Sequence, residues 1–310
     1  MRSRVLLGGL AAALAITGLA ACGDDKNPAA TSQKVDVVAG FYPLQFVAER
    51  VGGEHLSVVN LAQPGAEPHD MELKPSQIAQ IAAADLVIYL KTFQPELDKA
   101  IEQNAAGKSF DVTTVSPLEK GEAHEHEGEA SPAPSEEEGL DPHLWLDPTR
   151  LATISDAVAG QLGKADPANA ADYTARAATF KAELTKLDEE FTTGLKTCDR
   201  REIVTSHAAF GYLASRYKLD QIALTGLTPE TEPTPQRLAE VAAEAKEHGA
   251  TTIFFETLVS PKVAETLAKE VGAKTAVLDP LEGLAAGSTD DYFSVMRANL
   301  KGLRDALGCK

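Results

Sequence analysis

Three of the seven histidines stand in short, conformationally restricted segments, and neutral imidazole is a common ligand of Zn²⁺. His69 follows two prolines and a glycine, His143 lies between two prolines, and His207 follows a short β-branched run and opens a helical stretch. They lie much further apart in the chain than the ligands of a zinc finger or a helical HExxH motif. Each alone would be a capping or surface residue, but together they predict a site assembled from distant segments.

Two acidic residues follow predicted strands in the second half of the chain. Glu256 ends the apolar run 253–255, and Asp279 ends the run 276–278. Like His207, they fall at the carboxyl ends of strands, where parallel α/β sheets bind their ligands. Candidates from both halves of the chain should therefore converge on one cleft.

The elements that must position these residues are strands alternating with helices, a pattern typical of parallel sheets. A helix-rich tract over 149–197, interrupted at Asp166 and Pro167, separates two such sets and predicts a long helix from about 167 to 195. We expect an α/β fold in which two lobes, each a parallel sheet flanked by helices, are joined by one long rigid helix, with a metal in the interlobe cleft. The expected divisions are an N-terminal lobe over 35–150, a linker helix region over 151–198 and a C-terminal lobe over 199–310.

The segment 119–139 breaks this rhythm because it is rich in glutamate and proline and almost nothing in it can be buried. Such a composition predicts a loop rather than a folded element. It contains His124 and His126, which could gather metal, although glutamates outnumber histidines there.

The N-terminus has the order of a secretory signal: two arginines, an apolar run over 5–16 and small residues before Cys22. Leu-Ala-Ala-Cys resembles a bacterial lipobox, which implies a signal peptide over 1–21, lipidation of Cys22 and anchorage to the cell membrane. Residues 22–34 are small and polar, and we expect a flexible tether there. The alternative is an ordinary signal that releases a soluble extracytoplasmic protein.

Charge and the remaining cysteines narrow the choice further. A formal charge of −17 argues against a nucleic-acid partner, because no basic patch is available to neutralise phosphates. Cys198 and Cys309 are the only cysteines besides Cys22, and an even pair outside the cytoplasm predicts a disulfide. The alternative is two unpaired buried thiols.

Four segments together resemble the zinc/manganese-binding lipoproteins that serve as solute-binding components of bacterial ABC metal transporters. They are residues 65–76, 141–148, 205–213 and 278–281, and the resemblance runs in order over nearly all of 35–310. It implies metal held between two lobes by His69, His143, His207 and Asp279. The acidic segment before His143 resembles the longer His-rich loop of the zinc-specific, ZnuA-like branch.

Zinc is the metal that the side chains favour. Three neutral imidazoles with one carboxylate suit tetrahedral Zn²⁺, whereas Mn²⁺ prefers more oxygen donors, and manganese-binding relatives carry a carboxylate where His207 stands. Glu67 or water could replace Asp279 as the fourth ligand, and Glu256 could orient an imidazole. We expect one Zn²⁺ per chain, carried as the transported ligand.

The expected function is capture of Zn²⁺ by a monomer and its delivery to the permease of an ABC importer, without enzymatic activity. A manganese-selective member or a surface adhesin of the same fold is the alternative. A zinc hydrolase using Glu67 or Glu256 as base is more distant, because a fourth protein ligand closes the site to water.

Overall fold

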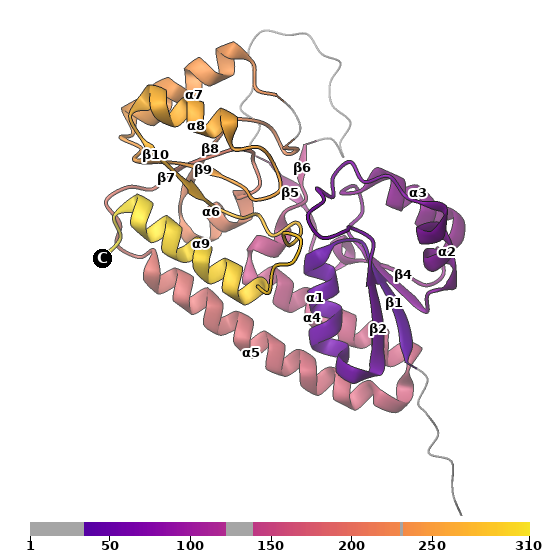
Figure 1. The fold of residues 1–310 in the computed structure, drawn as a ribbon. Helices are drawn as coiled ribbons and strands as arrows, with labels where there is room; N and C mark the ends of the chain where they lie inside the picture. The colour runs from indigo at the N-terminus through magenta and orange to yellow at the C-terminus, as the bar shows by residue number, and fades with distance from the viewer. Residues whose placement is uncertain (1–33, 122–138, 230–231) are drawn as a thin grey trace, which may run out of the picture. The chain divides into compact units, whose positions relative to one another are not determined.

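In the computed structural model, which describes residues 34–121, 139–229 and 232–310, the first sheet consists of four parallel strands in the order β2-β1-β3-β4 (Figure 1). Val37 of β1 pairs with Val58 of β2 on one side and with Leu86 of β3 on the other. The central strand β1 is almost wholly buried, as expected for a sheet covered on both faces. The elements of this half are β1 (Val35–Ala39), α1 (Tyr42–Gly52), β2 (Leu56–Asn60), α2 (Pro75–Ala83), β3 (Leu86–Tyr89), α3 (Pro95–Asn104) and β4 (Ser109–Asp111).

The second sheet repeats this arrangement with the order β10-β9-β7-β8. In both sheets the first strand in sequence pairs with the second and third, and the fourth lies at an edge. All pairs are parallel, which confirms the strand–helix–strand organisation that the sequence predicts. The elements are β7 (Glu202–Thr205), α6 (Gly211–Tyr217), β8 (Asp220–Ala223), α7 (Pro235–Glu247), β9 (Thr252–Phe255), α8 (Lys262–Val271), β10 (Lys274–Val277) and α9 (Tyr292–Leu307).

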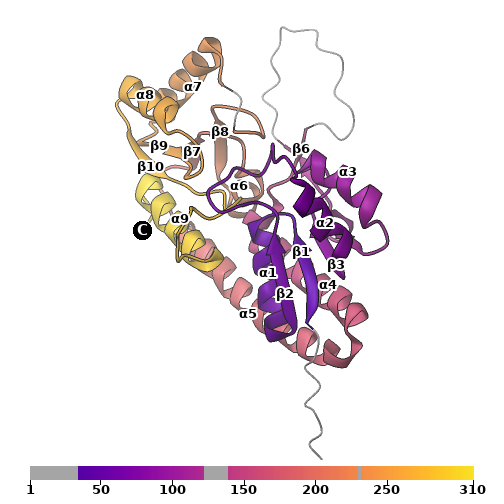
Figure 2. The same ribbon diagram turned by 45° about the vertical axis from the view of Figure 1, so that its right-hand side comes forward.

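Two helices connect the sheets, α4 (Pro148–Ala165) and α5 (Ala170–Gly194). The predicted break falls between them, where the 3-10 turn η4 (Pro167–Asn169) separates the helices. They pack against each other and both contact α1, while α5 also contacts α9 of the second half (Figures 1 and 2). The predicted long helix is therefore α5, and α4 packs against it.

A two-stranded antiparallel sheet, formed by β5 (Glu119–Lys120) and β6 (Leu140–Asp141), was not predicted. The sequence predicts a loop over all of 119–139, but its first two residues form a strand that pairs with the two residues that follow it. Tyr212 of α6 holds both strands, because its hydroxyl accepts from the Glu119 N–H at 2.8 Å and donates to the Asp141 carbonyl at 2.9 Å. His124 and His126 lie outside the described residues.

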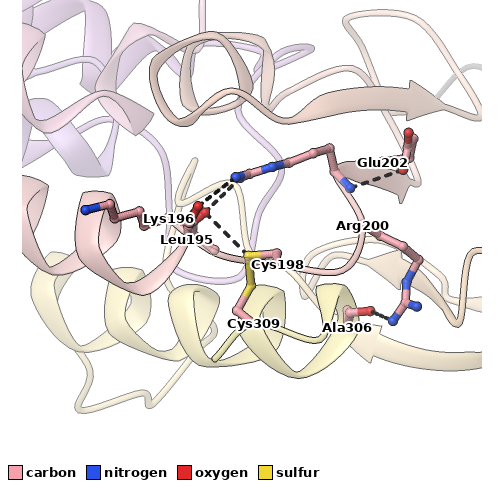
Figure 3. The surroundings of a disulfide bond; sticks show 8 residues. Leu195, Lys196, Cys198, Arg200, Glu202, Ala306 and Cys309 are labelled. Atoms are coloured by element: carbon pink, nitrogen blue, oxygen red, sulfur yellow. Dashed lines mark hydrogen bonds between the residues drawn. A yellow bond between two sulfur atoms is a disulfide. The ribbon is translucent and has the colours of Figure 1, made fainter.

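A disulfide joins Cys198, just after α5, to Cys309 at the end of the chain (Figure 3). This confirms the predicted pairing. Around it, the Arg200 guanidinium donates to the Ala306 carbonyl at 2.9 Å, and the Asp199 N–H donates to the Leu307 carbonyl at 3.0 Å. The strand that begins the second sheet and the last helix are thus tied together at their ends.

No helix among the described residues is long and apolar enough to cross a membrane. The predicted signal peptide over 1–21, the lipidated Cys22 and the tether, apart from its last residue, lie outside the described part of the chain.

Candidate metal centre

His69 lies in the loop over 61–74 that follows β2, and its side chain is 5 % exposed. The Phe93 ring packs edge-on against the imidazole with 4.6 Å between ring centroids. In the same loop, the Pro68 carbonyl accepts from the Gln94 amide at 3.3 Å, and the Glu67 carboxylate accepts from the His69 N–H at 3.0 Å. These contacts restrict the direction of the His69 ring.

His143 follows β6 and is fully buried at the start of the 3-10 turn η3 (Leu144–Leu146). One oxygen of Asp141 accepts from the His143 N–H at 2.9 Å and lies 2.7 Å from the ring Nδ1. A carboxylate at Nδ1 fixes that nitrogen as the donor and leaves Nε2 free to bind a ligand.

His207 follows β7 and is held in the same way from the neighbouring strand. Glu256, at the end of β9, places a carboxylate oxygen 2.8 Å from the His207 Nδ1, and the same oxygen accepts from the Ser206 hydroxyl at 2.7 Å. Through this contact Glu256 could orient the imidazole, which is the role that the sequence suggests for it.

Glu282 completes the group. Its Oε1 lies 3.3, 3.1 and 3.2 Å from the Nε2 atoms of His69, His143 and His207. The ligand atoms of these four buried residues all lie within 4.8 Å of one another, and no other cluster of this kind occurs among the described residues.

The distances from the Glu282 oxygen to the three imidazoles match three of the six edges of a tetrahedral site. With Zn–N and Zn–O distances near 2.0–2.1 Å, the edge between two ligand atoms of a tetrahedron is about 3.3 Å. The three Nε2–Oε1 distances match that edge. The other Glu282 oxygen, Oε2, is buried without a hydrogen-bond partner among the described residues, and a bound cation would compensate its charge.

Asp279 and Glu67 do not belong to this group. The Asp279 carboxylate instead accepts from the Thr257 hydroxyl and the Leu281 N–H, both at 2.8 Å, so Glu282 stands where the sequence led us to expect Asp279. The nearest Glu67 oxygen is 3.9 Å from the His69 Nε2. The sequence does not mark Glu282 as a ligand, because this residue lies beyond the end of the strand. It is a single acidic residue between a leucine and a glycine.

The protonation of the group reflects its burial and its charges. Burial lowers the pKa of the His207 imidazole, but hydrogen bonds with Glu256 and Glu282 outweigh this and raise the pKa to about 10. Burial would raise the pKa of Glu282, yet hydrogen bonds from His143, His207 and His69 hold it well below its usual value. In the metal-free protein at neutral pH, the His207 imidazole therefore carries a proton, and the carboxylates of Glu256 and Glu282 accept from it.

A cavity of about 310 Å³ adjoins the group and includes His69, Phe93 and Pro142 among its lining residues. Leu227 and Thr228 of the second half line it as well, but His143, His207 and Glu282 do not. His69 is thus the member of the group that lines this cavity.

Comparison with known proteins places these features in context. The family model described as "ZnuA: Zinc-uptake complex component A periplasmic" matches residues 37–306. The "High-affinity zinc uptake system protein ZnuA" of Bacillus subtilis is 36% identical over 304 residues, which cover 93% of each protein. The "Zinc-binding protein AdcA" of Streptococcus pyogenes is 38% identical over 291 residues, covering 87% of this chain and 56% of AdcA. The chain thus spans little more than half the length of that relative.

Solved structures have the same fold. The Zn(II)-bound ZnuA-like domain of Streptococcus pneumoniae AdcA superposes with a TM-score of 0.73 at 31% identity, covering 88% of this chain and 99% of the domain. The laminin-binding protein Lmb of Streptococcus agalactiae, described as bifunctional with adhesin and metal transporting activity, superposes with a TM-score of 0.77. It is 32% identical, and the match covers 88% of this chain and 99% of Lmb.

Proposed function

The chain belongs to the family of periplasmic zinc-uptake component A proteins, and on that basis we propose that it captures Zn²⁺ outside the cytoplasm and delivers it to the permease of an ABC importer. The observation that carries this proposal is the approach of three imidazole Nε2 atoms to one Glu282 oxygen at 3.1–3.3 Å. We assign ligand roles to His69, His143, His207 and Glu282, with one Zn²⁺ per chain. We propose a monomer as the functional unit, in which one chain supplies all four ligands.

The ligand chemistry supports zinc over manganese. Three nitrogen donors and one oxygen donor fill a tetrahedron, whereas Mn²⁺ is served better by additional carboxylates or waters. The same closure argues against a zinc hydrolase, because catalytic zinc sites keep a position open for water and this set supplies a fourth side chain. We therefore propose a carrier without enzymatic activity.

The proposed function requires the protein to lie outside the cytoplasm, close to the membrane that contains the importer. We propose that residues 1–21 are a signal peptide and that a lipid on Cys22 anchors the protein to the outer face of the cell membrane. Relatives named as zinc-binding lipoproteins support this assignment. Residues 35–150 and 199–310 would then act as two lobes linked through 151–198, with the metal between them.

Metal analysis tests the proposal directly. The purified protein, expressed without added zinc, should contain about one zinc per chain, and added zinc should raise its thermal unfolding temperature. His143→Ala should lose the bound metal, and the matched control His248→Ala, at a partly exposed site, should keep it. A wild-type protein that contains no zinc and gains no stability from it would contradict the proposal.

Delivery needs a test in cells. Zinc-limited growth of a strain that lacks this protein should be restored by the wild-type chain and by His248→Ala but not by His143→Ala. Cys22→Ala should release the protein from the membrane fraction, which separates anchorage from metal binding. Equal growth with and without the protein under zinc limitation would contradict a role in uptake.

A surface adhesin is a second candidate function, because the structural neighbour Lmb is described as having adhesin as well as metal transporting activity. Binding of the purified chain to immobilised laminin, compared between zinc-loaded and metal-free protein, tests it. Absence of binding in both states would remove this candidate.

A further inference from the structure

Side chains of Asn299, Trp145 and Thr257, from three other parts of the fold, form hydrogen bonds with the segment just before Glu282. Asn299 of α9 brackets Asp279: its Oδ1 accepts from the Asp279 N–H at 2.9 Å and its Nδ2 donates to the Asp279 carbonyl at 2.7 Å. The Trp145 indole N–H donates to the Pro280 carbonyl at 2.7 Å. The backbone of two consecutive residues is thus fixed just before Glu282.

Leu281, the next residue, adopts a conformation that leucine disfavours. Its φ is +58°, in the left-handed region, and its side chain is fully buried. The Asp279 carboxylate closes this turn, because its Oδ1 accepts from the Leu281 N–H at 2.8 Å while its Oδ2 accepts from the Thr257 hydroxyl at 2.8 Å. A short acidic side chain that binds the backbone two residues on is a known way to stabilise such turns.

From these contacts we infer that Asp279 is a positioning residue: it holds the Leu281 turn that aims the Glu282 carboxylate at the three imidazoles, and so favours a tetrahedral ion over one that needs more ligands. This inference rests on the proposed zinc-binding function. It assigns Asp279 a task in metal selection without direct coordination.

The link to selectivity is the fourth ligand. Three imidazoles alone leave positions that water can fill, which suits ions of higher coordination number such as Mn²⁺. A carboxylate fixed 3.1–3.3 Å from each Nε2 closes the tetrahedron. If the Leu281 turn relaxes, the Glu282 carboxylate is no longer held in one position. Water can then bind the ion in its place, and the ratio of the Zn²⁺ affinity to the Mn²⁺ affinity falls.

Two substitutions separate positioning from charge. Asp279→Asn keeps a carbonyl oxygen for the Leu281 N–H and a polar group for the Thr257 hydroxyl, but it removes the negative charge and a good metal ligand. Asp279→Ala removes both hydrogen bonds. If Asp279 acts by positioning Glu282, the Asp279→Asn variant should keep the zinc affinity of the wild type, and the Asp279→Ala variant should not.

The experiment is competitive titration of Zn²⁺ and Mn²⁺ into the full-length metal-free variants, together with visible spectra of their Co²⁺ forms. Tetrahedral Co²⁺ absorbs much more strongly than six-coordinate Co²⁺, so the spectrum reports the coordination geometry. A substitution that only destabilises the fold would not change the spectrum of the bound ion. Asp279→Ala should weaken zinc binding by about 10–100-fold, the usual effect of losing an outer contact, and lower the Co²⁺ absorption. Asp279→Asn should stay within about threefold of wild type.

A double variant sharpens the test. In a Glu282→Ala background, Asp279→Ala should add no further loss of zinc affinity, because the two residues act through one carboxylate. Thr257→Val, at an exposed position, should cause a smaller shift in the same direction and serves if Asp279→Ala does not fold. Asp305→Ala, an exposed acid on α9, controls for the loss of one negative charge.

The outcomes are distinguishable. Wild-type protein that binds no zinc overturns the proposed function itself. If the wild type binds zinc, then equal weakening by Asp279→Asn and Asp279→Ala, no weakening by Asp279→Ala, or additive losses in the double variant overturns the positioning role alone.

Discussion

Two carboxylates hold the imidazoles of His143 and His207 by their Nδ1 atoms, at 2.7 Å from Asp141 and 2.8 Å from Glu256. Because these contacts select the tautomer and the ring direction, they set how well both Nε2 atoms point at one ion. His69 is held differently, by packing against Phe93 and by hydrogen bonds to its loop.

Removing one of these carboxylates should weaken zinc binding without unfolding the protein. We expect Glu256→Gln to lower zinc affinity by about 10–100-fold, because the amide can present its NH₂ group to Nδ1 and favour the wrong tautomer. Competition with a chelator of known affinity measures the change. Glu202→Gln, at the start of β7, is the matched control, and an equal loss there would show a general rather than a local effect.

Zinc binding should release protons. Hydrogen bonds with Glu256 and Glu282 overcome the opposing effect of burial and raise the pKa of His207 from 6.5 to about 10 in the metal-free protein. Since Zn²⁺ binds the neutral ring, this proton must leave at any lower pH. At pH 7 we expect at least about one proton per zinc and an affinity that rises about tenfold per pH unit for each proton released.

Calorimetry in buffers of different ionisation enthalpy counts these protons. The raised His207 pKa also stabilises the metal-free fold fully below pH 6.5, and that contribution is lost as pH rises through about 10. A zinc affinity that does not change between pH 6 and 8 would contradict the assignment of a protonated His207 to the metal-free site.

Glu282 illustrates what residue types cannot reveal. The histidines could be found because prolines and predicted strand ends mark their segments, and the structure does bring all three together. Asp279 looked like the fourth ligand because it directly follows a strand. The left-handed turn at Leu281 redirects the chain, so the acid three residues later reaches the imidazoles instead. A leucine in that conformation leaves no mark in the sequence.

At the scale of elements, α5 is tied to both halves of the fold. Arg50 of α1 pairs with Glu183 at 2.5 Å, and Arg216 of α6 pairs with Asp188 at 2.6 Å, where Tyr217 also donates at 3.0 Å. One ion pair thus joins α5 to a helix of the first half, and another joins it to a helix of the second half. The lobes are held to one helix rather than to a flexible linker.

The Asp188 contact should matter most near neutral pH. Burial raises the pKa of Asp188, but hydrogen bonds from Arg216 and Tyr217 outweigh it and lower the pKa below the usual value. A lowered carboxyl pKa stabilises the fold above the unfolded pKa, and this stability disappears as pH falls through the folded pKa. Asp188→Asn should cost about 1 kcal/mol at pH 7 and less at pH 3.

Urea unfolding followed by circular dichroism at the two pH values tests this. The exposed pair of Asp156 with Lys181, between α4 and α5, provides the control, because Asp156→Asn should change the stability by less than about 0.5 kcal/mol. An Asp188→Asn variant as stable as wild type at pH 7 would contradict the tie between α5 and α6.

The elements themselves were largely predictable. Runs of β-branched residues separated by helical stretches indicate parallel strands, and an Asp-Pro pair marks the break between α4 and α5 because proline favours the first position of a helix. The strands β5 and β6 were not predictable, since each has only two residues and their pairing depends on Tyr212 of a distant helix.

At the scale of the whole molecule, the disulfide closes a loop that contains the entire second sheet. Cys198 and Cys309 are 111 residues apart, so cross-linking them restricts the unfolded chain strongly. Replacing both by serine should lower the free energy of unfolding by about 2–5 kcal/mol, while zinc stoichiometry stays unchanged because the ligands lie elsewhere. Denaturant unfolding with and without a reductant measures the loss.

The double serine variant is its own control, because a reductant should destabilise the wild type and leave the variant unaffected. Equal stability of the two proteins under oxidising conditions would contradict the structural role of this bond. The result would also show whether the second sheet and α9 unfold together with the first half.

Trp145 is the chain's only tryptophan, and its ring centroid lies 5.2 Å from that of His143 while its indole N–H binds the Pro280 carbonyl next to the Glu282 turn. Its fluorescence therefore originates beside the ligands and from no other part of the protein. When an ion displaces the His207 proton and binds beside the indole, the electric field at the indole changes, and we expect its emission to change as well. Trp145 should therefore act as an intrinsic fluorescent reporter of metal binding in solution, without any added dye.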